Sequence, residues 1–296
     1  MMTSAAPRRL AAAVSRRVSV RRLSAPASPL VRVESDAAHP TLKIVTLQSD
    51  PAKLNPMTVA LGEAFREQVG ALSQLPPSEL RCVLLTGEGR AFSAGGDLDF
   101  LEQRKHTSPT SNAIIMRSFY ARFLGALRAL PVPVVCHING PAIGAGCAVT
   151  MGADLRVTHD ACKLGFNFVK LGLHPGMGCT HTIRAAAGGQ LANRLLLTGD
   201  LVTGAEAATL GLVSASMPDV DAARAEALRL ARGITEQSPN AVRATLRTLR
   251  ARSDVGLEEA LQREADAQAQ SYASADYAEG LASIREKRTP AFPGDL

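Results

Sequence analysis

Apolar and polar positions alternate along the chain in two different periods, one typical of strands and one typical of helices. Residues 57–72 (MTVALGEAFREQVGAL) carry apolar side chains at helical spacing, and a stretch rich in long side chains before residue 132 is also helical in type. Six short segments have strand composition: 41–48, 81–87, 132–139, 154–159, 161–166 and 212–217. Short strands alternating with helices predict an α/β fold.

The pattern changes in the second half of the chain. From about Met177 onward it is mostly helical, and Pro239 to Arg288 is almost wholly helical and charged. Its alternating charges are typical of a solvated helix face, although a long terminal helix could also pack on a neighbouring subunit. We therefore expect a core over residues 34–235 and a C-terminal helical oligomerisation region over 236–296.

The basic charge of the chain is concentrated at its N-terminus. The formal net charge is +6, and residues 1–33 hold seven arginines and no acid, which leaves −1 for the remainder. Composition that is rich in Arg and Ser and free of acids is typical of an organelle transit peptide. We predict a mitochondrial matrix protein with a leader over residues 1–33, and we expect the cleavage that removes the transit peptide to fall near Arg22 to Ser28. Without that leader, the charge and the 4% aromatic content disfavour nucleic acid as a partner.

The remaining composition excludes several classes of protein. Apolar content of 46% and charged content of 20% are ordinary for a globular protein, and no apolar run approaches the roughly 18 residues of a membrane-spanning helix. The five cysteines form no C-x-x-C pair, so reduced buried thiols are expected. The six histidines form no H-E-x-x-H motif, so no metal site is expected.

Two segments of small residues contain the candidate chemistry. Ala94-Gly95-Gly96-Asp97 follows one predicted strand, and Gly144-Ala145-Gly146 follows another. The second lacks the third glycine of a dinucleotide fingerprint, and no Walker lysine follows it. Both segments expose backbone N–H groups, and the second is expected to open a helix, whose N-terminus favours negative charge. Two such donors directed at one point would form an oxyanion hole for the enolate of a thioester.

Four ordered motifs resemble the crotonase (enoyl-CoA hydratase/isomerase) family. They are RAFSAGGDL, PVPVVCHINGPAIGAGC, LLLTGDLVTGAEAATLGLVS and SADYAEGLASIREKR, and the resemblance runs from about Thr41 to the C-terminus. It implies a spiral of ββα units with a C-terminal helical region, assembled as homotrimers or homohexamers. It also implies an acyl-CoA substrate in fatty-acid or acyl-CoA metabolism. No separate cofactor is implied, because coenzyme A enters with the substrate.

The resemblance assigns roles to individual positions. It places the oxyanion N–H donors at Gly96 and Ala145, the carbonyl of Ala94 near the CoA adenine, and a phosphate-binding lysine at Lys287. The family often has a base just after the first oxyanion loop, where this chain has Asp99.

The chain departs from the family at its catalytic acids. The two glutamates of the hydratases correspond to Ala148 and Phe168, and the acid of the isomerases lies nearest Gly176. These three positions are expected to line the substrate pocket. Losing a positioned acid or base typically costs about 10²–10⁴-fold in rate.

Other side chains are weighed as replacements for these acids. His174 is a catalytic candidate, and Asn167 and Lys170 could supply polarity. Structural roles are expected for the other three: a structural histidine at His137, an inert thiol at Cys147 and a capping residue at Asp97. Two functions stay open: a hydratase/isomerase-like enzyme, or a catalytically impaired acyl-CoA binder that assembles with active relatives.

Overall fold

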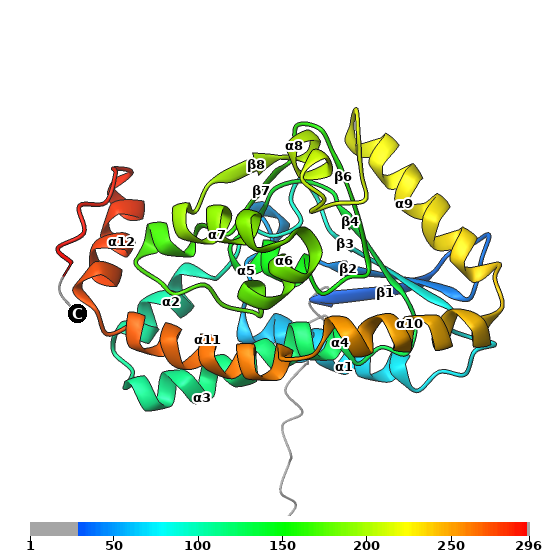
Figure 1. The fold of residues 1–296 in the computed structure, drawn as a ribbon, viewed down its shortest axis with the longest axis horizontal. Helices are drawn as coiled ribbons and strands as arrows, with labels where there is room; N and C mark the ends of the chain where they lie inside the picture. The colour runs from blue at the N-terminus through cyan, green and yellow to red at the C-terminus, as the bar shows by residue number, and fades with distance from the viewer. Residues whose placement is uncertain (1–28, 295–296) are drawn as a thin grey trace, which may run out of the picture.

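The computed structural model describes residues 29–294, which form an α/β fold around a six-stranded sheet (Figure 1). The strand order is β1-β2-β3-β4-β6-β9, and all neighbours are parallel except the antiparallel pair β1 and β2. The bounds are β1 Val31–Ser35, β2 Leu42–Leu47, β3 Cys82–Gly87, β4 Val134–Ile138, β6 Leu155–His159 and β9 Ala215–Met217. Parallel strands need crossover connections, and the helices supply them.

A second sheet of three short strands lies next to the candidate chemistry. Strand β5 (Ala142–Ile143) pairs parallel with β7 (Lys163–Gly165), which pairs antiparallel with β8 (Leu201–Thr203). Because β5 begins four residues after β4 ends, the chain passes directly from the main sheet into the second glycine segment.

Helices make up most of the remaining chain. Many begin at a Ser, Thr or Asp whose side chain accepts a hydrogen bond from the first turn, as at Thr58, Ser108 and Asp219. The α-helices are α1 Val59–Ser73, α2 Leu98–Lys105, α3 Pro109–Tyr120, α4 Ala126–Arg128, α5 Ala145–Thr150, α6 Cys179–Ala187, α7 Gly189–Thr198, α8 Gly204–Thr209, α9 Val220–Thr235, α10 Pro239–Ser253, α11 Leu257–Ser271 and α12 Ala275–Glu286. A π-helical turn, Ala121–Gly125, joins α3 to α4, and Pro51–Lys53 and Asn167–Leu171 are 3₁₀ helices.

Both faces of the main sheet are buried. Val83 and Leu85 of β3 face the larger core, whereas Cys82 and Leu84 face α9. Helix α9 meets the sheet through three alanines at i, i+4 spacing, Ala223, Ala227 and Ala231, which allow a close approach. This packing explains why Cys82–Leu85 is a continuous apolar run rather than an alternating pattern.

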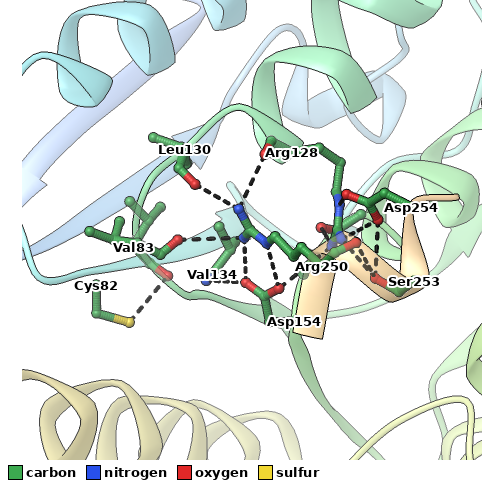
Figure 2. A network of polar contacts seen from close by, with 12 residues as sticks. Cys82, Val83, Arg128, Leu130, Val134, Asp154, Arg250, Ser253 and Asp254 are labelled. Carbon is green, nitrogen blue, oxygen red and sulfur yellow. Dashed lines mark hydrogen bonds and ion pairs between the residues drawn. The ribbon is translucent and has the colours of Figure 1, made fainter. Parts of the chain in front are cut away.

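A buried arginine ties the C-terminal helices to the sheet. Arg250 of α10 pairs bidentately with Asp154, at 3.0 Å from Nε to Oδ1 and 2.6 Å from Nη2 to Oδ2 (Figure 2). Its Nη1 donates to the carbonyl of Leu130, and Asp154 accepts a hydrogen bond from the Val134 N–H. One ion pair therefore joins α10, the start of β4 and the residue before β6.

The predicted elements agree with the structure except at the N-terminus and in the second sheet. Strand β1 begins at Val31, so residues 31–33, which were assigned to the leader, belong to the main sheet. Pairing with β2 holds them there. Strands β5 and β8 were also missed. The predicted transit peptide lies largely in residues 1–28, outside the described residues. No helix within residues 29–294 combines the length and apolar character needed to cross a membrane.

Candidate functional site

The two small-residue segments run side by side. Ser93 and Ala142 form a parallel bridge, in which the Ile143 N–H donates to the Ser93 carbonyl at 3.0 Å and the Ser93 N–H donates to the Pro141 carbonyl at 3.2 Å. The first segment thus follows β5 along its edge, and Gly96 and Ala145 come to line the same cavity.

The close approach of the segments requires glycine at Gly95. Its φ is +97°, in the left-handed region that favours glycine. A Cβ atom there would lie 2.7 Å from the carbonyl oxygen of Ile143 and 3.7 Å from the amide nitrogen of Ala145. A side chain at this position would push the segments apart and cover the second one.

The N–H groups of Gly96 and Ala145 are free to bind a ligand. Neither donates a hydrogen bond to any atom of the described residues, whereas Gly95 N–H donates to Ser93 Oγ and Gly144 N–H donates to the Gly165 carbonyl. Ala145 is the first residue of α5, where N–H groups have no partner within the helix. Gly144 precedes it with φ +55°.

A cavity of about 130 Å³ lies against Gly96 and Ala145. Helices α2, α3, α11 and α12 and the 3₁₀ helix Asn167–Leu171 supply its other walls. Leu98 and Ile284 are 50% and 39% exposed and lie at its mouth, whereas Tyr120 and Gln268 are each 2% exposed and lie at its inner end. None of its lining residues within the described chain is Asp, Glu, His, Lys or Arg.

The inner end of the cavity is formed by three uncharged polar side chains. Tyr120 on α3 donates its hydroxyl to Gln268 Oε1 on α11 at 2.7 Å, and Tyr272 Oη lies 3.4 Å from the same oxygen. Gln268 Nε2 donates to the His174 carbonyl. Burial raises the pKa of Tyr120 well above its ordinary value, with a smaller contribution from Tyr272, so this phenol stays neutral.

Several of the predicted site residues come together at the cavity. Gly96, Ala145, Ala94, Phe168 and Gly176 all line it, and so does Asn167. Phe168, at which the family resemblance leads us to expect a glutamate, is buried. A Cβ atom on Gly176 would lie 2.3 Å from Tyr120 Oη, so a side chain at this position would collide with the Tyr120 hydroxyl.

Other predicted residues lie away from the cavity. Ala148 is fully buried in the hydrophobic core and does not line the cavity, contrary to expectation, because it lies one turn into α5, within the core packing. His174 is half-buried and also outside the lining; its Nδ1 lies 2.6 Å from the Pro175 carbonyl, and burial lowers its pKa. Lys170 and Asp99 are exposed and outside the lining.

Lys287 lies near the cavity mouth but not in it. It is exposed, and it ends α12 in a left-handed conformation with φ +53°. Its N–H donates to the carbonyl of Ile284, the residue of α12 that lines the mouth.

The structural roles expected for three other residues agree with the structure. Asp97 caps α2 by accepting the Phe100 N–H at 2.9 Å. His137 is buried in β4 with its Nδ1 3.1 Å from Thr86 Oγ1. Cys147 is a buried free thiol, and burial raises its pKa to about 12, so it is not a nucleophile at neutral pH. Among residues 29–294, no group of three or more His, Cys, Asp or Glu side chains is placed to hold a metal ion.

The inner end of the cavity is not evident from the sequence. Tyr120 and Gln268 lie 148 residues apart on two helices, and both occupy positions that fit an ordinary amphipathic pattern. No motif marks them. The glycine at 176 is the one local signal, because its side-chain space is taken by Tyr120.

Similarity to known proteins identifies the family of the chain. A family model described as enoyl-CoA hydratase/isomerase matches residues 40–295, so the chain belongs to that family. A Thermus thermophilus protein assigned as an enoyl-CoA hydratase is 34% identical over 252 residues, 84% of this chain and 96% of the relative.

A second relative and a solved structure extend the comparison. The 1,2-epoxyphenylacetyl-CoA isomerase of Escherichia coli is 33% identical over 219 residues, 73% of this chain and 82% of that enzyme. The crystal structure of an enoyl-CoA hydratase from Mycobacterium avium subsp. paratuberculosis superposes with a TM-score of 0.78 at 28% identity, covering 90% of this chain and 99% of that one. The fold is therefore that of the crotonases.

Proposed function

We propose that this protein binds acyl-CoA thioesters and polarises the thioester carbonyl through the N–H groups of Gly96 and Ala145. The observation that supports the proposal most directly is that Gly96 and Ala145 line one cavity and that their N–H groups have no acceptor among the described residues. A carbonyl oxygen placed between them would complete both hydrogen bonds. As negative charge develops on that oxygen, the hydrogen bonds strengthen, which is how an oxyanion hole accelerates a reaction.

The chemistry proposed is of the hydratase/isomerase type, with unusual proton-transfer groups. The lining offers no carboxylate and no imidazole, and its O–H donors belong to Tyr120 and Tyr272. A phenol with a raised pKa can donate a proton to an enolate, but it is a poor base at neutral pH. Water would have to enter the cavity to take part in hydration.

A second candidate function is an acyl-CoA binder with impaired catalysis that assembles with active relatives. The uncharged lining favours it, because no acid lines the cavity among the described residues and Phe168 lines it where the family resemblance leads us to expect a glutamate. On this alternative the same N–H groups would hold the thioester without turnover.

The remaining parts of the proposal concern coenzyme A, location and assembly. Ala94 is exposed beside the cavity and Lys287 is exposed near its mouth, which supports roles in holding the adenine and the phosphates. The acid-free, arginine-rich leader supports a mitochondrial matrix location. We propose a homotrimer or homohexamer on the resemblance alone. N-terminal sequencing of the mature protein tests the leader, and sedimentation velocity tests the assembly.

The decisive experiment measures binding and turnover of 2-enoyl-CoA thioesters of four to twelve carbons by the leaderless protein. Turnover on the order of 1–10³ per second indicates the enzyme. Binding without product indicates the impaired binder. Infrared spectroscopy with a ¹³C-labelled thioester carbonyl gives a readout that needs no turnover, because polarisation lowers the carbonyl stretching frequency.

Two proline substitutions test the assigned donors, and an alanine substitution serves as the control. Gly96→Pro removes one N–H, and Gly96→Ala keeps it, with a Cβ atom in ordinary contact at 3.4 Å from Leu101. Ala145→Pro removes the other N–H at the first helical position, where proline is tolerated. Each proline variant should abolish most of the infrared shift and lower any turnover about 10²–10³-fold, and Gly96→Ala should not. An unchanged shift in both proline variants would disprove the assignment.

A further inference from the structure

We infer that the cavity selects an uncharged acyl group no larger than about one aromatic ring, and that Tyr120, Gln268 and Tyr272 set this limit. The inference rests on the proposed function and adds the class of acyl group. It follows from the size of the cavity, the nature of its inner end and the position of the nearest charges.

The cavity is small and closed at its inner end. Its volume of about 130 Å³ is close to that of the ~150 Å³ apolar cavity that holds one benzene molecule. The Tyr120, Gln268 and Tyr272 side chains that close it are each 2% exposed and hydrogen-bonded to one another. A longer chain would have to break these hydrogen bonds in a close-packed interior.

The cavity offers no compensation for a charged acyl terminus. Its wall combines apolar side chains, such as Phe119 and Met177, with the uncharged inner end, and no cation lines it among the described residues. Burying a carboxylate without a counter-ion is far more costly than burying a methyl group of similar size. An acyl chain that ends in a carboxylate should therefore be rejected.

Two buried charged side chains, Arg104 and Glu264, lie behind the cavity wall. The guanidinium carbon of Arg104 lies 4.7 Å from the centroid of the Phe100 ring, and its Nε donates to the Phe100 carbonyl; its Nη1 has no partner among the described residues, but Arg104 does not line the cavity. Glu264 accepts the N–H groups of Gly178 and Thr180 and does not line the cavity either.

The test compares hexanoyl-CoA with adipyl-CoA, which has the same chain length but ends in a carboxylate. Isothermal calorimetry on the leaderless full protein should give a dissociation constant at least about 100-fold higher for adipyl-CoA. Palmitoyl-CoA, which exceeds the cavity, should bind at least tenfold more weakly than hexanoyl-CoA.

A substitution at the inner end should weaken the charge selection. Gln268→Lys places a cation there, and it should reduce the ratio of adipyl-CoA to hexanoyl-CoA dissociation constants by at least tenfold. Gln270→Lys makes the same change at an exposed position on α11 and should leave the ratio unchanged. Circular dichroism melting identifies a variant that fails to fold, and the comparison on the unmodified protein stands without it.

The outcomes separate this inference from the proposed function. If hexanoyl-CoA binds no more tightly than coenzyme A, the proposed thioester site is wrong. If hexanoyl-CoA binds tightly and adipyl-CoA or palmitoyl-CoA binds within threefold of it, the thioester site stands and the inferred selection is overturned.

Discussion

The first turn of α5 packs directly on Ser93: a Cβ atom on Gly146 would lie 2.6 Å from the Ser93 carbonyl oxygen and 2.7 Å from the Ser93 Cβ atom. This contact sets the spacing between the two segments that hold Gly96 and Ala145. It leaves no room for any other residue at position 146 unless the backbone moves.

Gly146→Ala should therefore destabilise the protein by about 1–3 kcal/mol and weaken acyl-CoA binding, because the added methyl group separates the two segments. Urea unfolding and calorimetry measure the two effects. Gly233→Ala is the matched control, because Gly233 also lies in a helix but has open space around it. This variant should be about 0.5–1 kcal/mol more stable than the unmodified protein. Equal effects of the two substitutions would contradict the packing argument.

Tyr120 and Gly176 should show strong coupling in a double-mutant cycle. Gly176→Ala alone places a methyl group 2.3 Å from the Tyr120 hydroxyl, and Tyr120→Phe removes that oxygen. The cost of Gly176→Ala should fall by at least about 1 kcal/mol in the Tyr120→Phe background. Tyr277→Phe removes another buried hydroxyl, the one that donates to the Leu101 carbonyl, and should give no such coupling. Unfolding free energies of the six proteins provide the comparison.

Arg250→Ala should cost about 2–4 kcal/mol, because it removes the bidentate partner of the half-buried Asp154 carboxylate and leaves it only Arg128, whose Nη1 lies 3.5 Å from Asp154 Oδ1. Arg250→Lys should recover only part of this loss, since an ammonium group cannot pair bidentately. Arg252→Ala on the exposed face of α10 should change stability by less than about 0.5 kcal/mol. A similar small effect at Arg250 would refute the role assigned to the ion pair.

His137 should make the protein less stable in acid. Burial and the charge of Arg224 lower its pKa to about 4, below the ordinary value of 6.5. Between these values the unfolded chain binds the proton and the folded chain does not, so stability rises with pH from about 4 to 6.5. The full shift corresponds to about 3 kcal/mol. The slope of unfolding free energy against pH should decrease in His137→Gln and stay unchanged in His106→Gln, whose side chain is exposed.

Introducing a glutamate should have opposite consequences at Ala148 and at Phe168, the two positions at which the family resemblance leads us to expect one. Ala148→Glu places a carboxylate in the closed core and should cost at least about 3 kcal/mol, whereas Ala244→Glu, on the exposed face of α10, should be nearly neutral. Phe168→Glu adds a carboxylate to the cavity wall and should raise the hydration rate of crotonyl-CoA. A hydration gain from Ala148→Glu and none from Phe168→Glu would reverse this assignment.

The parts of the fold that follow from local chemistry could be predicted from the sequence. The apolar run of β3 reflects burial on both faces of the sheet, and the glycines at 95 and 144 mark backbone conformations that other residues avoid. These signals located the two segments that border the cavity.

Features that depend on distant pairing could not be predicted. Strand β1 is held by its register with β2, which its own residues do not reveal. The Tyr120–Gln268 hydrogen bond joins helices far apart in sequence, and each residue alone fits an ordinary core position. The family resemblance likewise placed Ala148 at the pocket, but the packing of α5 turns it into the core.

The backbone N–H groups and the side chains that surround the cavity come from separate parts of the chain. The N–H groups belong to segments next to the sheets, while the inner end and the mouth belong to α2, α3, α11 and α12. Evolution could therefore remodel the helices, one substitution at a time, and leave the segments by the sheets unaltered. Paralogues of this protein could diverge in substrate specificity long before they lose the ability to bind a carbonyl group.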